Sequence, residues 1–258
     1  MKIHVRQLIR VRKKVAAFTA DLFAEVSSSM FNEDEFSADL IGGWLGDILH
    51  AVGMENPEQQ TDAFLAELPV VRRKLEQDAN FMFEGDPAGH SVEEVISSYP
   101  GFYAIAVYRL ASVLLKQGIP LVPRMMSASA QGTTGVDIHP GASIDSPVSI
   151  DHGTGVVIGE TARVAHHVKL FQGVTLGALT VEKGLENSKR HPTIEDHVVI
   201  YSNSTILGGE TRIGAHSVIG GNVFLTKSVA PYSVVYHRAE ISIRSKNKPE
   251  NEPINFVI

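Results

Sequence analysis

The sequence contains no cysteine, so the chain has no disulfide bond, no thiolate metal site and no acetyl-cysteine intermediate. It also lacks a basic excess. With 23 lysines and arginines against 29 acidic residues, nothing attracts the whole chain to nucleic acid or to an anionic membrane. No window approaches the roughly 20 uncharged apolar residues of a membrane span, and no apolar segment follows the basic residues near the N-terminus. We therefore expect a cytoplasmic protein that binds neither nucleic acid nor membrane.

The first part of the chain has the pattern of a helical domain. Apolar residues recur at helical spacing around Phe64 and from Phe102 to Leu110, and Pro57 and Pro100 stand where helices begin. Such apolar stripes are typical of a core or of a subunit contact, and not of a cofactor site. We expect an α-helical oligomerisation domain over residues 1–122.

After Pro123 a six-residue repeat replaces the helical pattern. The recurring aliphatic residues are Ile138, Ile144, Ile150, Ile158, Val164, Leu170, Leu176, Ile194, Ile200, Ile206, Ile213, Ile219 and Leu225. A hexapeptide repeat is typical of a parallel β-helix, in which three short strands close one coil and coils stack at about 4.8 Å. We predict an α+β protein with a β-helix catalytic domain over residues 123–235 and a C-terminal tail over 236–258.

A polar segment interrupts the repeat between Gly177 and Thr193 and ends in Arg190-His191-Pro192. Long excursions from a solenoid often carry function, because the coils hold the ends of the loop while it reaches a neighbour. A tolerated insertion is the alternative interpretation. We expect a protruding loop at this point.

Asp137 and His152 form the first candidate catalytic pair. They are fifteen positions apart, slightly less than three hexapeptides, so we expect them on neighbouring coils, roughly 5 Å apart along the axis. A carboxylate on one imidazole nitrogen raises the basicity of the other, which then takes a proton from an alcohol. From spacing alone, an ordinary surface hydrogen bond remains the competing interpretation.

Residues 86–228 resemble bacterial serine acetyltransferases over nearly their whole length. The matching motifs are Asp86-Pro87, VDIHPGA at 136–142, DHGTGVVIGETA at 151–162, QGVTLG at 172–177 and RHP at 190–192. Hexapeptide repeats occur in many acyltransferases, but this combination separates the family from its sugar-acetylating relatives. The resemblance implies left-handed coils and transfer of an acetyl group from acetyl-coenzyme A to the L-serine hydroxyl, the first step of cysteine biosynthesis from serine.

The resemblance also implies a role for each site residue. His152 is the general base and Asp137 orients it, while Asp86 and Asp151 hold the substrate ammonium. Arg190 and His191, from the loop of an adjacent subunit, receive the substrate carboxylate, for which a planar guanidinium is well suited. A zwitterionic amino acid needs this arrangement of anions, a base and a cation.

The acetyl-coenzyme A site is expected in the groove between adjacent β-helices. The residues assigned to it are Gly177, Ser202, Gly220 and Lys227. Gly177 supplies a backbone amide for the oxyanion, and Lys227 meets a phosphate unless it is an ordinary solvated lysine. Tyr201 stands where the family often has a small residue, which leaves the detailed cofactor contacts open.

Further partners follow from the resemblance. We expect a homotrimer, or a dimer of trimers if the N-terminal helices pair, and L-cysteine as a feedback inhibitor in the serine site. The polar, proline-containing tail ends in apolar residues and Ile258, which resembles the peptide that docks into O-acetylserine sulfhydrylase. A terminal strand packing on its own subunit is the alternative.

Two other enzymatic activities and one inactive state compete with this assignment. One is an acetyltransferase for another hydroxyl acceptor, which has no use for the charges of Asp86 and Arg190. The second is a zinc hydratase of the γ-carbonic anhydrase kind, although no metal is expected here and the helical half and RHP loop argue against it. A catalytically silent scaffold is the third. The histidines that keep the zinc alternative open are His152, His166, His167, His191 and His197.

Overall fold

The computed structural model describes residues 5–30, 36–179 and 188–238. Within them, the helices are α1 (Val5–Ser28), α2 (Ala38–Ala51), α3 (Pro57–Gly85), α4 (Val92–Ser98), α5 (Pro100–Lys116) and α6 (Val122–Thr134). The centre of the predicted loop and nearly all of the tail expected at 236–258, with its sulfhydrylase-docking end, lie outside the described residues. Among the described residues, no helix combines the length and the apolar character that a membrane span requires.

The strands that follow form three parallel sheets. Sheet A holds β1 (Asp137–Ile138), β4 (Val157–Ile158), β7 (Thr175–Gly177), β10 (Thr205–Leu207) and β13 (Phe224–Leu225). Sheet B holds β2 (Ser143–Ile144), β5 (Arg163–Val164), β8 (Thr193–Ile194) and β11 (Arg212–Ile213). Sheet C holds β3 (Val148–Asp151), β6 (Val168–Phe171), β9 (Val199–Ile200), β12 (Val218–Ile219) and β14 (Val234–Val235).

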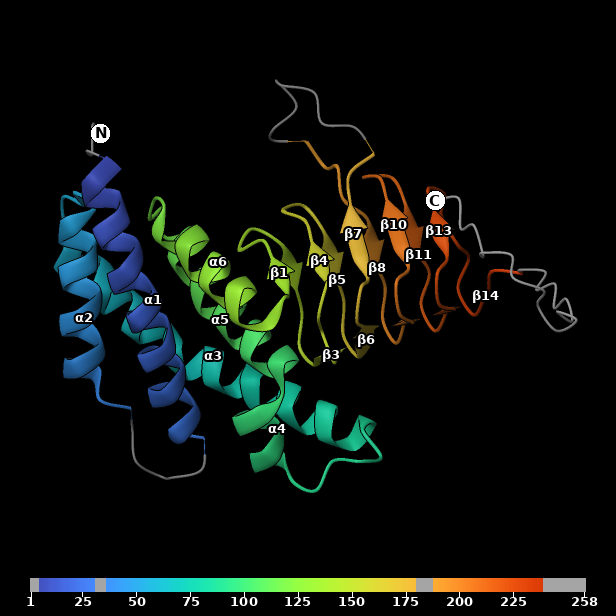
Figure 1. Ribbon diagram of the computed structural model, residues 1–258, viewed down its shortest axis with the longest axis horizontal. Helices are drawn as coiled ribbons and strands as arrows, with labels where there is room; N and C mark the ends of the chain where they lie inside the picture. The colour runs from blue at the N-terminus through green and yellow to red at the C-terminus, as the bar shows by residue number, and fades with distance from the viewer. Residues whose placement is uncertain (1–4, 31–35, 180–187, 239–258) are drawn as a thin grey trace, which may run out of the picture.

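Each of the first four coils of this parallel β-helix takes one strand from sheet A, then B, then C, while the fifth has strands in sheets A and C alone. The coils stack into the column on the right of Figure 1. The repeat residues stack in register, as with Ile138, Ile158 and Leu176. All of them are buried except Leu225, which is partly buried in the last coil. The predicted fold class is confirmed, because one aliphatic side chain per strand fills the interior.

We name the turns of the β-helix by the sheets they connect. The CA corner joins a sheet C strand to the next coil's sheet A strand, the AB corner joins sheets A and B, and the BC corner joins sheets B and C. Several corners place a residue other than glycine in the left-handed region, including His152 at φ 55°. Asn and His tolerate this conformation better than most residues, so the side chain of His152 is fixed at a tight turn.

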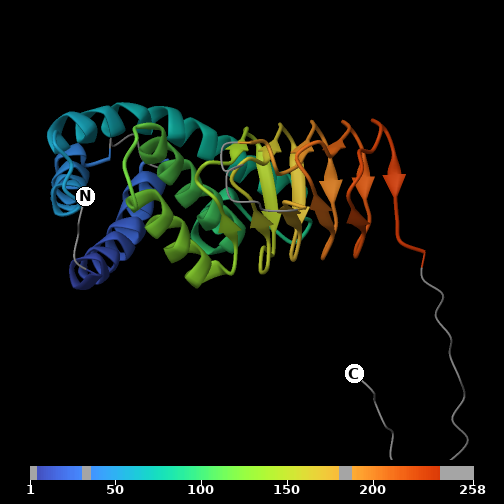
Figure 2. The same cartoon turned by 90° about the horizontal axis from the view of Figure 1, so that it is seen from above.

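The helical half caps one end of the β-helix, as both views show (Figures 1 and 2). Helix α5 is buried along its length and starts against β3, where a Cβ on Gly101 would lie 2.0 Å from the carbonyl oxygen of Ile150. Only glycine permits this approach. The domain boundary expected at residue 123 differs from the structure, because α6 occupies Val122–Thr134 and the first strand starts at Asp137.

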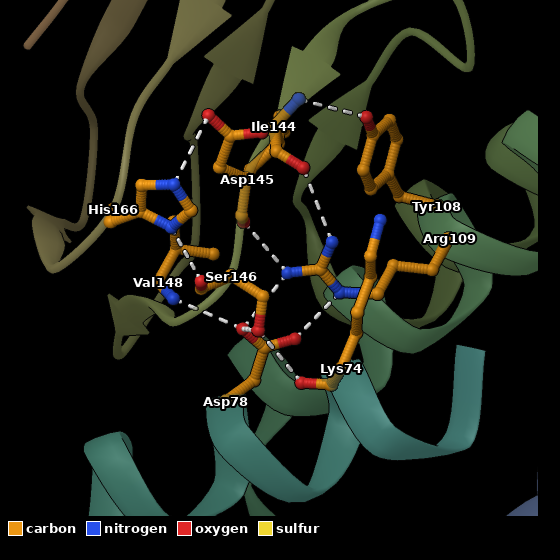
Figure 3. Close-up of polar contacts among 9 residues, drawn as sticks. All are labelled: Lys74, Asp78, Tyr108, Arg109, Ile144, Asp145, Ser146, Val148 and His166. Carbon is orange, nitrogen blue, oxygen red and sulfur yellow. Dashed lines mark hydrogen bonds and ion pairs between the residues drawn. The ribbon is translucent and has the colours of Figure 1, made fainter. Parts of the chain in front are cut away.

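A buried ion pair joins the two halves (Figure 3). Arg109 on α5 donates from Nε and Nη2 to the Asp78 carboxylate on α3 at 2.6 and 2.8 Å. The same guanidinium donates to the carbonyl oxygens of Ile144 and Asp145, and Asp78 accepts the N–H of Val148 at 3.0 Å. Both helices are thereby fixed to the first coil, and the C-terminal end of α3 comes to lie beside sheet C.

Candidate active site

His152 projects from the first CA corner, directly after β3. Its side chain is 75% exposed, and its Nε2 lies 3.9 Å from Oδ1 of Asp151. The next residue, Gly153, has a φ of 84°, and a Cβ there would lie 2.8 Å from the Val136 side chain. The turn therefore holds its backbone against the coil and leaves the imidazole accessible to a substrate.

Asp86 lies close to this histidine from the end of α3. Its Oδ2 accepts a 2.6 Å hydrogen bond from the Tyr99 hydroxyl, and its Oδ1 accepts the N–H of Ala88 at 2.8 Å. The hydrogen bond from Tyr99, the hydrogen bond from Ala88 and, to a smaller extent, the proximity of His152 and Lys169 lower the pKa of Asp86. The bond to Asp86 raises the pKa of Tyr99 to about 12. The carboxylates of Asp86, at the end of α3, and Asp151, at the CA corner, thus both lie near the His152 imidazole.

Lys169 on β6 is a residue that the sequence did not single out. Its Nζ donates to the carbonyl oxygen of Gly85 at 3.3 Å and lies 5.4 Å from the centroid of the Phe81 ring. A cation at this position stabilises the negative end of the α3 dipole and the backbone just before Asp86. No repeat or motif marks Lys169, since only tertiary packing brings α3 over β6.

His191 lies at the AB corner, in the predicted loop's C-terminal segment. The N–H of Thr161 donates to Nδ1 at 3.1 Å, so the proton of the neutral ring is on Nε2. Burial, together with the cations of Arg190 and Lys189, lowers the pKa of His191 to about 4. The imidazole rests on Gly159, where any Cβ would overlap it. His191 is therefore a neutral hydrogen-bond donor at pH 7.

Arg190 is held at the same corner. Its Nη2 pairs with Oε2 of Glu160, and its backbone N–H donates to Oγ1 of Thr161 at 2.9 Å. Lys189 donates to the carbonyl oxygens of Thr161 and Pro192, and burial lowers its pKa to about 8. Sequence reasoning missed Glu160 and Thr161 as partners of the loop, although both lie within the matched motif at 151–162.

Asp137 pairs with Arg124 and makes no contact with His152 within the described residues. Its carboxylate lies 4.0 Å from Nη1 of Arg124, and in the described residues no hydrogen bond or ion pair joins it to His152. The reason is the coil length: Asp137 pairs with Val157, twenty positions on, so fifteen positions end one corner short of a full turn. The expected Asp137–His152 contact is absent within the chain, and the carboxylate nearest His152 is that of Asp151.

The predicted cofactor residues divide between two corners. Ser202 and Gly220 follow β9 and β12 at the CA corner, the corner of His152. Gly177 ends β7, and Lys227 is exposed after β13, so both belong to the AB corner of Arg190 and His191. The predicted site residues of one chain therefore form two groups, which we call half-sites, on separate edges of the β-helix.

The histidines of the zinc alternative are also dispersed. His166 contacts the Ser146 carbonyl at 2.6 Å, and His167 and His197 stack on each other at the BC corner with ring centroids 4.6 Å apart. Across the described ranges, no three histidine, cysteine, aspartate or glutamate side chains are grouped as a metal site requires. The geometry gives the zinc alternative no support.

No protein-family model matches the chain. It is 44% identical over 202 residues to the plasmid serine acetyltransferase of Synechococcus elongatus, a match that spans 76% of this chain but only 62% of that relative. It is 42% identical over 163 residues to the serine acetyltransferase of Staphylococcus xylosus, covering 63% of this chain and 73% of the relative.

The crystal structure of Entamoeba histolytica serine acetyltransferase 1 in complex with L-cysteine superposes with a TM-score of 0.74 at 30% identity. That match covers 88% of this chain and 99% of the other. The similarity thus includes the helical half as well as the β-helix, and so extends to the elements that position Asp86 beside His152.

Proposed function

The chain belongs to the serine acetyltransferase family, and we propose that it transfers the acetyl group of acetyl-coenzyme A to the hydroxyl of L-serine. The observation that carries the proposal is the cluster of Asp86, Asp151 and His152 at one accessible corner. Two carboxylates suit an ammonium group, and the exposed imidazole between them suits an alcohol that must lose its proton. A neutral sugar acceptor would use neither carboxylate.

The reaction needs one proton carrier. The imidazole of His152 accepts the proton of the serine hydroxyl while the oxygen attacks the thioester carbonyl carbon. The tetrahedral intermediate then collapses, the carbon–sulfur bond breaks, and the thiolate leaves with the proton that His152 held. Products are O-acetyl-L-serine and coenzyme A. Asp151, at 3.9 Å, is the carboxylate placed to stabilise the imidazolium.

The substrate carboxylate is assigned to Arg190 and His191 of a neighbouring subunit. Glu160 and Thr161 fix the Arg190 guanidinium and the neutral His191 ring at the AB corner. Because the CA and AB corners are different edges of one β-helix, a second copy has to supply the other half-site. A homotrimer satisfies this requirement with three equivalent sites. The assignment of L-cysteine as an inhibitor rests on the cysteine-bound relative, since cysteine differs from serine only at the reacting atom.

Thiol release from acetyl-coenzyme A tests the reaction. We expect turnover with L-serine but not with D-serine, L-homoserine or a galactoside, and loss of turnover in His152→Asn. Asparagine tolerates the left-handed turn, which keeps the fold. His197→Asn is the matched control, because His197 occupies a corner with a φ of 58° and belongs to neither half-site. Turnover of the galactoside by the wild type would contradict the proposal.

Mixed oligomers test the shared site. His152→Asn and Arg190→Ala subunits should each be inactive alone. Mixed in equal amounts, they should recover about a quarter of the wild-type activity, because about one subunit interface in four then brings an intact His152 together with an intact Arg190. A mixture that stays inactive would show that both halves act within one chain.

A further inference from the structure

The CA corner carries a column of outward-facing positions, one per coil, that starts at Asp151 in the candidate active site. Asp151 pairs in register with Phe171, and the pairing of Leu170 with Ile200 places Tyr201 on the next coil above Phe171. The two aromatic rings are stacked, with centroids 4.8 Å apart and planes 12° from parallel. Aromatic rings on neighbouring coils of this column therefore lie one coil spacing apart.

The same column continues through Gly220 to Tyr236. Ile200 pairs with Ile219, and Ile219 pairs with Val235, so Gly220 follows Tyr201 and precedes Tyr236. Tyr201 and Tyr236 are 45% and 72% exposed. The column thus has rings on three coils and, at Gly220, a coil without a side chain between two tyrosines.

The BC corner provides an internal comparison. There His167, His197, His216 and Tyr232 stack at centroid distances of 4.6, 4.7 and 4.8 Å, with planes 6–8° from parallel. Every coil from β6 to β14 supplies a ring to that column. In the CA column, the step from Tyr201 to Tyr236 spans two coils, about 9.6 Å, which accommodates one planar ring at stacking distance from each tyrosine.

We propose that Tyr201, Gly220 and Tyr236 form the subsite for the adenine ring of acetyl-coenzyme A, with the base stacked between the two tyrosines over Gly220. The inference rests on the proposed function, which places the thioester at His152. From that corner, Gly220 is three coils away, about 14 Å along the axis, on the same edge of the β-helix. An extended pantetheine arm connects the two points along this edge, past Ser202.

The stacking also explains a departure from the expected pattern. A tyrosine at position 201 stands where the family often has a small residue, and its ring lies stacked on that of Phe171. Base–aromatic stacking contributes roughly 1–3 kcal/mol per base, or about a fivefold to hundredfold change in affinity. Gly220 keeps the space between the tyrosines open.

Two acetyl donors test the subsite: acetyl-coenzyme A and acetyl-pantetheine, which lacks the adenine nucleotide. Tyr201→Leu and Tyr236→Leu should each raise the KM for acetyl-coenzyme A about tenfold and leave the KM for acetyl-pantetheine and L-serine unchanged. Tyr201→Phe should retain the wild-type values, because it keeps the ring. Tyr232→Leu, at the end of the BC column, is the matched control and should change neither KM.

A second measurement keeps this test independent of the reaction. Calorimetric binding of coenzyme A and of adenosine 3′,5′-bisphosphate should weaken in both leucine variants, whether or not L-serine is the acceptor. Equal losses with acetyl-coenzyme A and acetyl-pantetheine, or unchanged binding of adenosine 3′,5′-bisphosphate, would overturn the subsite. Absence of serine turnover in the wild type, with adenine binding still dependent on Tyr201, would instead reject the proposed function alone.

Discussion

Tyr99 donates a 2.6 Å hydrogen bond to Oδ2 of Asp86, and this bond connects the start of α5 to the end of α3 beside His152. It is the largest of the causes that lower the pKa of Asp86. The carboxylate assigned to the substrate ammonium is therefore kept ionised and oriented by a residue that precedes α5.

We expect Tyr99→Phe to raise the KM for L-serine several-fold without changing the KM for acetyl-coenzyme A. The pKa of Asp86 then returns toward its ordinary value, so protonation competes with ammonium binding at higher pH than before. The rise in KM should accordingly be larger at pH 4, near the ordinary pKa of an aspartate, than at pH 8. Steady-state kinetics at both pH values measure this, with Tyr103→Phe as the control, and an equal effect at both would contradict the role of the bond.

Lys169→Met should likewise raise the KM for L-serine a few-fold, because α3 loses the cation at its C-terminus and Asp86 loses a neighbouring positive charge. Lys169→Arg should restore most of the wild-type value. Lys227→Met removes an exposed lysine elsewhere on the β-helix and is the control, for which the KM for L-serine should not change. A kcat loss without a change in KM would argue against a positioning role.

Thr161→Val removes the oxygen that accepts the N–H groups of Arg190 and His191 at 2.9 and 3.1 Å. The shape of the side chain is kept, so the loop loses its anchor without a cavity. We expect kcat/KM for L-serine to fall roughly tenfold to a hundredfold, and Thr161→Ser to retain activity. Wild-type kinetics in the valine variant would show that the AB corner does not depend on this oxygen.

The Asp78–Arg109 pair should dominate the stability of the junction between the two halves. Because both side chains are almost completely buried, Asp78→Asn or Arg109→Met should each lower the free energy of unfolding by about 3–5 kcal/mol. The double variant Asp78→Asn/Arg109→Met leaves no charge unpaired and should lose less than the sum of the two single losses. Urea unfolding of the four proteins measures the coupling, and strict additivity would contradict it.

Sequence periodicity was sufficient for the β-helix because its interior is one-dimensional. A single aliphatic position per strand, such as Ile144 or Ile200, is buried whatever the rest of the chain does, and the six-residue spacing survives in the sequence. Periodicity was insufficient at the boundary between the two halves, because α6 extends the helical half to Thr134. It was also insufficient for the contacts of Asp137, because the first coil is longer than three hexapeptides.

The sequence by itself determined the coil repeat, the interrupting loop and the residue types that the chemistry needs, since these depend on local spacing and side-chain identity. Only the tertiary structure decided that Asp86 meets His152 through α3, that Lys169 and Tyr99 support it, and that Arg190 and His191 lie on another edge. These contacts join residues far apart in the chain. Their geometry depends on how the Asp78–Arg109 junction orients the helices against the first coil, and no periodicity encodes that orientation.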